Sequence, residues 1–402
     1  MRSCRVKRAA GFKLSWQASS FVPAIKLERE KDCKKPMIIL NNEEVGALLS
    51  MENCLRLLER AYQEQAEGTA VNRPRSDLYL PATTSGGVYC FKTMEGALTQ
   101  EKVVALRLNS DVIKWEEKGG RIMKDKVPAA PGNKWVGLVL LFSVETGEPL
   151  AIFPDGVIQG IRVAASSGLA ARFLAREDST VVGILGSGWQ ARAHARAMCS
   201  VRAVEKILVH SPTKSNREKF ATEVEKELNI SVEPVGSGEF LADRADILVA
   251  ATNSVSRVVP PEWLRPGMHL TCVKITELGD ETLAKADRLV IHARKFAPEN
   301  YIAGYGDEKI ECHDPIDFLT EGGKGSSVTP KQPFWLGAPE LKDVVSGKAQ
   351  GRQSTQEITC FNNNIGLGIQ FAALGKAVFD DAKSKGMGRE IPTDWFLETV
   401  HP

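Results

Sequence analysis

The sequence predicts an α/β protein that combines a doubly wound parallel sheet with a second, mixed sheet. The apolar run 181–185 leads into Gly-Ser-Gly-Trp-Gln-Ala at 186–191 and then into helix-compatible residues 192–200. This is the order of a strand, a tight turn and a helix. Strands and helices then alternate from 206 to 291, which is typical of a parallel sheet with helices on both faces. Residues 71–152 contain successive short strands, which predict an antiparallel or mixed sheet.

Composition limits the classes of partner. The 402 residues suffice for two or three domains. A formal charge of +2 gives no electrostatic basis for binding nucleic acid or a membrane surface, and no apolar run reaches the ~20 residues that span a bilayer. The eight cysteines form no Cys-x-x-Cys pair, and the six histidines show no metal-ligand spacing. We therefore predict no metal site.

Residues 1–36 form a basic leader. Lysine and arginine recur before the first acidic residue, Glu28, and serines accompany them, as in an organelle transit segment. A disordered leader, or a start at Met37, fits the same residues. The expected location is therefore cytoplasmic or organellar.

The first half begins with a strand and two helices. Residues 37–40 predict the strand, and an asparagine at 41 or 42 can cap the first helix. The second helix, 51–67, places Tyr62 on its apolar face. Further strands are predicted at 76–80, 87–93, 103–108 and 135–144. Residues 115–133 are rich in Lys, Gly and Pro and predict an exposed loop.

The second half opens with a small-residue helix at 160–176 that leads into the glycine turn. The strands that follow are predicted at 206–209, 231–235, 246–251, 269–273, 288–291 and 358–361. Helices are predicted at 214–228, 339–347 and 365–383. The polar, glycine-rich residues 311–335 predict a long loop.

The glycine turn predicts a dinucleotide site. Gly186 permits the turn, Gly188 lets the backbone approach a pyrophosphate, and small Ala191 lets the helix pack on the strand. Trp189 and Gln190 open the helix, whose free N–H groups and dipole attract phosphate.

Three stretches together resemble the ornithine cyclodeaminase/mu-crystallin family. They are Asp-Gly at 155–156 with Arg-Val-Ala-Ala at 162–165, the Gly-x-Gly-x-Gln-Ala turn, and Gly-Arg…Glu-Ile-Thr-x-Phe at 351–361. The resemblance implies a Rossmann-type domain, residues 166–347, inserted into a mixed α+β domain of residues 37–165 and 348–402. The mixed α+β domain would bind substrate and form a homodimer. Members of the family move hydride between a nicotinamide and an amino-acid carbon.

Three arginines match the family's carboxylate-binding cations: Arg75, Arg107 and Arg162. A planar guanidinium grips a carboxylate with two parallel hydrogen bonds. Arg73 is close enough to Arg75 in the sequence to take its role. The substrate implied is an amino or imino acid.

The role of Lys92 depends on the alignment. If Met94 matches the family's Met-Pro site, Arg107 falls on the family's active-site lysine, and Lys92 falls where the cyclodeaminase uses glutamate. If Lys92 is itself that lysine, Arg107 is only nearby. In both cases we expect Lys92 to face the substrate as a cation or a proton donor.

The expected cofactor is NADP(H) rather than NAD(H). NAD sites usually place an acid after the second nucleotide-domain strand, whereas this chain offers Ser211, Thr213, Lys214 and Arg217. Further cofactor contacts are expected at strand ends and at the start of the last helix: Thr252, Asn253, Val273, Asn364 and Gly366.

Two departures from the family pattern disfavour ornithine. The aspartate that the cyclodeaminase carries after the fifth nucleotide-domain strand is absent, and the family's Gln-Asp stands here as Gln370-Phe371. Without these acids a second, cationic amine loses its partners. We therefore predict an NADP(H)-dependent amino-acid dehydrogenase or imine reductase. The alternatives are a cyclodeaminase with another substrate and a non-catalytic NADP(H)-binding protein.

Overall fold

The computed structural model describes residues 36–84, 86–118, 121–254, 256–295, 298–304, 306, 309–311 and 333–400. The predicted leader, apart from residue 36, and most of the predicted loop 311–335 lie outside these residues. Among the described helices, none has the length and apolar character needed to cross a membrane.

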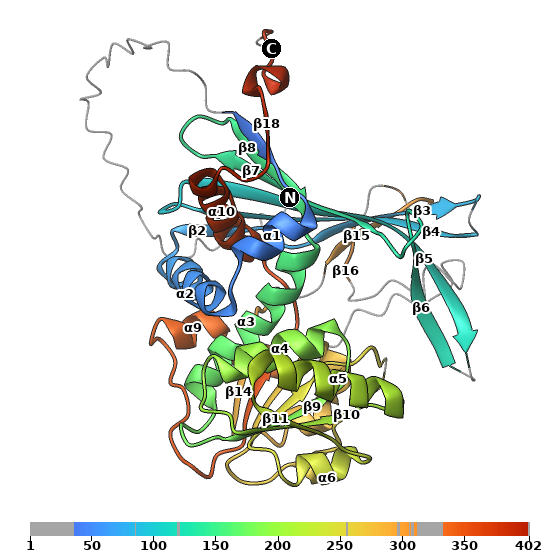
Figure 1. Ribbon diagram of the computed structural model, residues 1–402, viewed down its shortest axis with the longest axis vertical. Coiled ribbons are helices and arrows are strands. Elements are labelled where there is room, and N and C mark those ends of the chain that lie inside the picture. The colour runs from blue at the N-terminus through green and yellow to red at the C-terminus, as the bar shows by residue number, and fades with distance from the viewer. Residues whose placement is uncertain are drawn as a thin grey trace, which may run out of the picture. The chain divides into compact units, whose positions relative to one another are not determined.

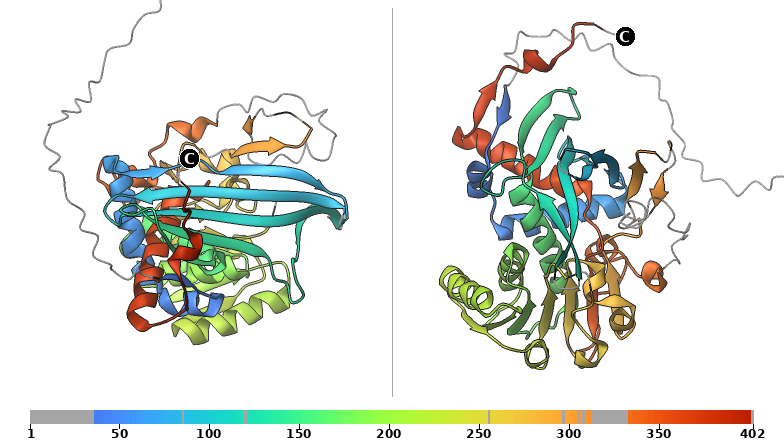
Figure 2. Two further views of the ribbon diagram at one scale, coloured as in Figure 1. Left: turned by 90° about the horizontal axis from the view of Figure 1, so that it is seen from above. Right: turned by 90° about the vertical axis from the view of Figure 1, so that its right-hand side faces the viewer.

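Within the described residues, eleven strands form one mixed sheet (Figures 1 and 2). In chain order they are β1 (Met37–Ile39), β2 (Ala70–Asn72), β3 (Ser76–Ala82), β4 (Gly87–Leu98), β5 (Val103–Lys118), β6 (Arg121–Val127), β7 (Val136–Ser143), β8 (Pro149–Pro154), β15 (Glu299–Ile302), β16 (Ile310–Glu311) and β18 (Arg389–Ile391). The order along the sheet is β16-β15-β3-β4-β5-β7-β8-β1-β18, with β2 on β4 and β6 on β5. The long antiparallel strands β3, β4 and β5 run side by side in the left view of Figure 2.

Four helices pack on this sheet and on one another. They are α1 (Asn42–Leu48), α2 (Met51–Glu67), α3 (Gly156–Leu174) and α10 (Gly368–Lys385). Asn41 caps α1 as predicted, because its side chain accepts from the N–H of Glu44. A single apolar core lies between α10, α2 and α3 and the strands β4, β5 and β7.

The second sheet is parallel throughout its described strands, in the order β11-β10-β9-β12-β13-β17-β14. These strands are β9 (Val181–Leu185), β10 (Lys206–His210), β11 (Ser231–Pro234), β12 (Ile247–Ala250), β13 (His269–Cys272), β14 (Arg288–Ile291) and β17 (Thr359–Asn362). The helices around it are α4 (Trp189–Cys199), α5 (Lys214–Leu228), α6 (Gly238–Ala242), α7 (Gly279–Leu283) and α9 (Leu341–Val345). The chain reverses direction across the sheet at β9, so the carboxyl ends of β9 and β12 flank a topological switch point. This is the predicted Rossmann-type fold.

Short 3₁₀ turns complete the chain: η1 (Pro261–Trp263), η2 (Ile275–Glu277), η3 (Phe334–Gly337) and η4 (Thr393–Phe396).

Helix α3 joins the two sheets. It packs on α2 and α10 from the mixed-sheet side and on α4, β13 and β17 from the parallel-sheet side, and Figure 1 shows it between them. Its composition explains this position, because its alanine, glycine and serine side chains let neighbouring elements approach closely on every face.

One sequence prediction needs correction. Residues 115–118 and 121–127 are not loop but belong to the paired strands β5 and β6. A hairpin is held by backbone pairing, which a Lys- and Gly-rich composition does not reveal.

Two strand pairings cross the predicted domain boundaries, which stay a prediction. β17 lies in the parallel sheet, although it falls within 348–402, and β15 pairs with β3 although it falls within 166–347. Such pairings join residues that are distant in the chain, so local patterns do not report them.

Candidate functional site

The turn between β9 and α4 has the geometry that its glycines require. Gly186 has a φ of +113°, and a Cβ on it would lie 2.2 Å from the carbonyl oxygen of Ala251. A Cβ on Gly188 would have no atom within 4 Å, so space is open above it. Helix α4 begins without a side-chain cap and without an acid in its first turn. Its first N–H groups are therefore available to an anion.

A cavity of about 1050 Å³ lies at the carboxyl ends of β9, β10 and β12. Eight of the predicted cofactor residues line it: Gly186, Gly188, Trp189, Gln190, Ser211, Thr213, Thr252 and Asn253. Its described lining also includes three cations that the sequence reading missed, Arg192, Lys219 and Arg257, and contains no Asp or Glu. The lining is therefore suited to a ligand that carries several phosphates.

Six predicted cofactor residues do not line this cavity: Ala191, Lys214, Arg217, Val273, Asn364 and Gly366. Ala191 is fully buried, as close packing of helix on strand requires. Lys214 is exposed beside Glu218, and Arg217 donates to the carbonyl oxygens of Ser211 and Pro212. Their roles toward a cofactor stay predictions.

The start of α5 supplies a second uncapped helix end. Its N-cap Thr213 makes no side-chain capping bond, and its first turn contains no acid. The hydroxyl of Ser187 in the glycine turn donates to Ser211 Oγ at 3.0 Å. Ser211 thus links the two helix N-termini around the cavity.

Glu277 holds the far wall of the cavity. Its carboxylate accepts from the N–H and hydroxyl of Thr252, at 2.6 and 2.7 Å, and from the N–H groups of Val273 and Lys274. Burial nevertheless raises its pKa. Its described contacts join the ends of β12 and β13, a structural role.

Arg162 is a buried cation with neutral partners. It lies on α3, donates from Nη1 to Gln370 Oε1 at 3.1 Å and from Nη2 to Gln159 Oε1 at 2.8 Å, and its Nε has no partner within the described residues. Its guanidinium carbon lies 5.4 Å from the ring centre of Phe371. Burial, followed by the charge of Arg107, lowers the pKa of Arg162 to about 9. No described carboxylate bonds to it.

Arg107 and Arg75, in contrast, have carboxylate partners. Arg107 Nε donates to Asp155 Oδ2 at 2.7 Å, and its guanidinium carbon lies 5.6 Å from the centre of the Phe371 ring. Arg75 Nε donates to buried Asp77 at 3.0 Å. The charges of Arg107 and Arg75 both act on Arg162. The three predicted carboxylate binders therefore form one group, in which only Arg162 has no described carboxylate bonded to it.

Lys92 lies on the same face of the mixed sheet. It pairs with Asp77 of β3 and Asn109 of β5, and Met94 pairs with Arg107. Because side chains alternate along a strand, Lys92 shares the face of Arg107 and Asn109. Which family position Lys92 matches stays a prediction.

The segment after β17 places Gly366 against the Arg162 guanidinium and Asn364 against the residues that follow β14. The Asn364 side chain accepts from the N–H groups of His292 and Ala293 and donates to the Ala293 carbonyl. A Cβ on Gly366 would lie 2.1 Å from Arg162 Nη1. The described contacts of both residues are therefore with the protein.

Two adjacent buried serines of α3 connect these regions. Ser166 contacts Tyr62 and Gln370, behind Arg162. Ser167 accepts from Thr271 and Asn363 and bonds to His194 of α4, whose Nδ1 lies 2.8 Å from the Gln190 carbonyl. Sequence reasoning missed both serines and the buried histidines. The available signal was Tyr62, since a hydroxyl on an apolar helix face needs a partner.

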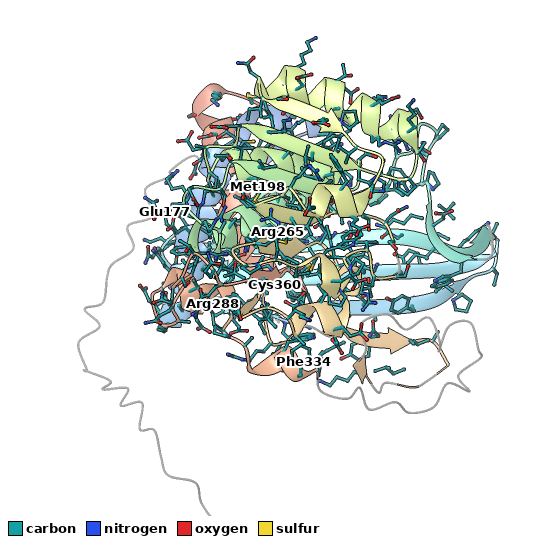
Figure 3. The ribbon with its side chains drawn as sticks, turned by 90° about the horizontal axis from the view of Figure 1, so that it is seen from below. Glu177, Met198, Arg265, Arg288, Phe334 and Cys360 are labelled. Atoms are coloured by element: carbon teal, nitrogen blue, oxygen red, sulfur yellow. The ribbon has the colours of Figure 1, made fainter. Side chains whose placement is uncertain are left out.

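The 351–361 stretch is structural in its described contacts. Arg352 donates to the carbonyls of Leu174, Gly267 and Met268, and Glu357 pairs with Arg288 at 2.8 Å. Figure 3 labels Arg288 and Cys360 on the neighbouring strands β14 and β17. The motif joins the end of α3 to the parallel sheet.

A model of the ornithine cyclodeaminase/mu-crystallin family matches residues 35–386. The chain belongs to this family. An alanine dehydrogenase of Archaeoglobus fulgidus is 28% identical over 370 residues, which cover 88% of this chain and 98% of the relative. The predicted family is thereby confirmed.

Two solved structures of family relatives share the fold. The Thermococcus litoralis Δ1-pyrroline-2-carboxylate reductase, in complex with NADH and L-proline, has a TM-score of 0.68 and 27% identity and covers 88% of this chain and 100% of its own. An archaeal alanine dehydrogenase dimer with bound NAD has a TM-score of 0.67 and 25% identity and covers 88% and 98%. The family relatives named here are dehydrogenases and reductases, which confirms the predicted oxidoreductase class.

Proposed function

We propose that this family member is an NADP(H)-dependent imine reductase or amino-acid dehydrogenase, which moves hydride to or from the carbon α to a carboxylate. The observation that carries the proposal is Arg162, a buried guanidinium that has only neutral partners among the described residues. An unpaired buried charge is costly. A substrate carboxylate would supply the missing partner through two hydrogen bonds.

The cavity supports a nicotinamide dinucleotide, and its lining favours the phosphorylated form. The glycine turn and the uncapped start of α4 suit the pyrophosphate. Ser211, Thr213 and Lys219, with the uncapped start of α5, suit a 2′-phosphate. The described lining offers no acid for a ribose 2′-hydroxyl.

The chemistry assigned to the protein is orientation and proton transfer. A bound nicotinamide supplies or accepts the hydride. Arg162, with Arg107 and Arg75 beside it, holds the substrate carboxylate and so fixes the α carbon. In the direction of reduction the imine nitrogen gains a proton, which Lys92 or a water molecule donates. The carboxylate of the substrate and that of the product then bind the same arginines.

The related alanine dehydrogenase is a dimer in its solved structure. By analogy we propose that this chain forms a homodimer. Size-exclusion chromatography with light scattering tests this, and a monomeric mass contradicts it.

The test of function follows NADPH absorbance with a panel of substrates: 1-pyrroline-2-carboxylate, its six-membered homologue, and 2-oxo acids with ammonia. We expect oxidation of NADPH with at least one imine and its loss in Arg162→Ala. The matched control is Arg172→Ala, because Arg172 lies on the same helix but is half-exposed and pairs with Glu59. NADPH that binds without oxidation across the panel contradicts the proposal and favours a binding protein.

The second candidate, a cyclodeaminase, has its own signature. It would release ammonia from a diamino acid with only catalytic NAD. The Phe371 ring beside Arg162, at the position where the family carries an aspartate, argues against a cationic substrate side chain.

A further inference from the structure

Arg162 ends a chain of four hydrogen bonds that begins at the backbone of residue 365. Its members come from four elements: His292 follows β14, Tyr62 lies on α2, Gln370 on α10 and Arg162 on α3. We propose that His292 and Tyr62 are positioning residues, which act through the Gln370 amide to hold Arg162 in place without neutralising it. This inference rests on the proposed role of Arg162 in binding a carboxylate.

The orientation of the Gln370 amide is fixed by the backbone. The N–H of Leu367 donates to Gln370 Oε1 at 2.9 Å, so this atom must be the oxygen. The same oxygen accepts from Arg162 Nη1. The amide nitrogen then faces Ser166 Oγ at 2.7 Å and the Tyr62 hydroxyl at 3.1 Å, and donates to both.

The orientation of the Tyr62 hydroxyl follows from His292. His292 Nδ1 contacts the carbonyl oxygen of Ile365, which can only accept. Nδ1 therefore carries the proton, and in a neutral ring Nε2 is an acceptor. Tyr62 lies 2.7 Å from Nε2 and must donate to it. Every bond in the chain thus donates away from Arg162.

The chain stabilises a buried cation with dipoles instead of a directly bonded carboxylate. Burial lowers the pKa of His292 to about 3 and raises the pKa of Tyr62, so both groups are neutral near pH 7. Each dipole in the chain presents its negative end toward Arg162. The guanidinium keeps its full charge for a substrate carboxylate. A carboxylate in place of the Gln370 amide would cancel that charge.

The kinetic test is a double-mutant cycle. Tyr62→Phe and His292→Phe remove one link each, and the second keeps a ring against Tyr62 and Phe361. We expect each to raise KM for the imine about tenfold, the effect of one hydrogen bond, with kcat changed less than threefold and the Kd of NADPH unchanged. Because both act through one chain, the double variant should match the single variants. Tyr89→Phe is the control, since that hydroxyl contacts only Ser110 among its described partners.

Multiplicative effects on KM, or an unchanged KM in both single variants, would overturn the inference. An equal weakening of NADPH binding would also overturn it, because the chain would then have only a general structural role.

A second measurement needs no substrate. The ¹⁵N shifts of the His292 ring should show a protonated Nδ1 and a bare Nε2 at pH 7. Gln370→Glu exchanges the donating nitrogen for an oxygen, so Tyr62 must turn to donate to it. Nε2 of His292 then loses Tyr62 as a donor, so we expect its ¹⁵N shift to change and the imine KM to rise. A protonated Nε2 in the wild type contradicts the proposed hydrogen-bond chain, even if the enzyme proves active. An unchanged shift in Gln370→Glu contradicts it too. If no imine is reduced while the shifts behave as expected, the proposed function is contradicted and the proposed hydrogen-bond chain is supported.

Discussion

Replacing Gly366 by alanine tests the placement of Arg162. The new Cβ would lie 2.1 Å from Arg162 Nη1 and 2.6 Å from both Cζ and Nη2. To reach an ordinary contact of 3.4 Å, the guanidinium must retreat by about 1.3 Å, while the side chains of Gln370 and Gln159 hold it. A shift of this size costs about one charge-assisted hydrogen bond to the substrate, roughly 2 kcal/mol. We expect kcat/KM to fall about 30-fold.

The assay measures initial rates of imine reduction together with the Kd of NADPH by fluorescence. Gly46→Ala in α1 is the control, because no atom lies within 4 Å of its Cβ position and alanine favours a helix. A kcat/KM within twofold of the wild type refutes the geometry. A loss that follows the Kd of NADPH instead assigns Gly366 to the cofactor, as the sequence predicted.

Three further predictions concern the cofactor, the substrate face and acid stability. Ser211→Asp places a carboxylate at the end of β10 and should raise KM for NADPH more than tenfold without raising KM for NADH; equal effects on both in steady-state assays contradict the assignment. Asp155→Asn leaves Arg107 without its buried partner and should lower the free energy of unfolding in urea by about 3 kcal/mol, whereas an unchanged midpoint argues against the ion pair. Burial lowers the pKa to about 4 for His194 and to about 3 for His269 and His292. The unfolded chain therefore binds more protons below pH 6.5, and stability should fall as pH falls, by roughly 3 kcal/mol per unit from pH 6 to pH 5. Glu277, with a raised pKa, opposes part of this loss, and a flat urea midpoint over that range would show that these rings are not buried.

Local patterns predicted the regular elements of the nucleotide-binding part well. The periodicity places α5 at 214–228 and β14 at 288–291, the bounds that the structure has. Both elements depend on local sequence, because their apolar spacing and flanking residues lie within or next to the element itself. The β5–β6 hairpin and the insertion of β17 between β13 and β14 depend on distant pairing instead. No window of the sequence contains that information.

The candidate site shows the same division. Gly186, Gly188 and Arg162 could be found because a motif surrounds each of them. Lys219 and Arg257 could not, because a helix face and a loop bring them to the cavity only after folding. His292 is the clearest case. In the sequence it is one of six histidines with no metal spacing, and its role depends on Tyr62, 230 residues away.

The adjacent serines of α3 bear on how this protein can be recombined with its relatives. Ser166 belongs to the group behind Arg162, and Ser167 belongs to the group behind the glycine turn. The predicted boundary between residues 165 and 166 passes through the middle of this helix. A chimera cut there would divide the helix and separate Ser166 from Tyr62 and Gln370, whereas Ser167 would stay with His194 and Thr271. A cut in 175–180, after α3 ends and before β9 begins, keeps both serines with the helix that aligns them. The unit that engineering can exchange therefore begins at β9.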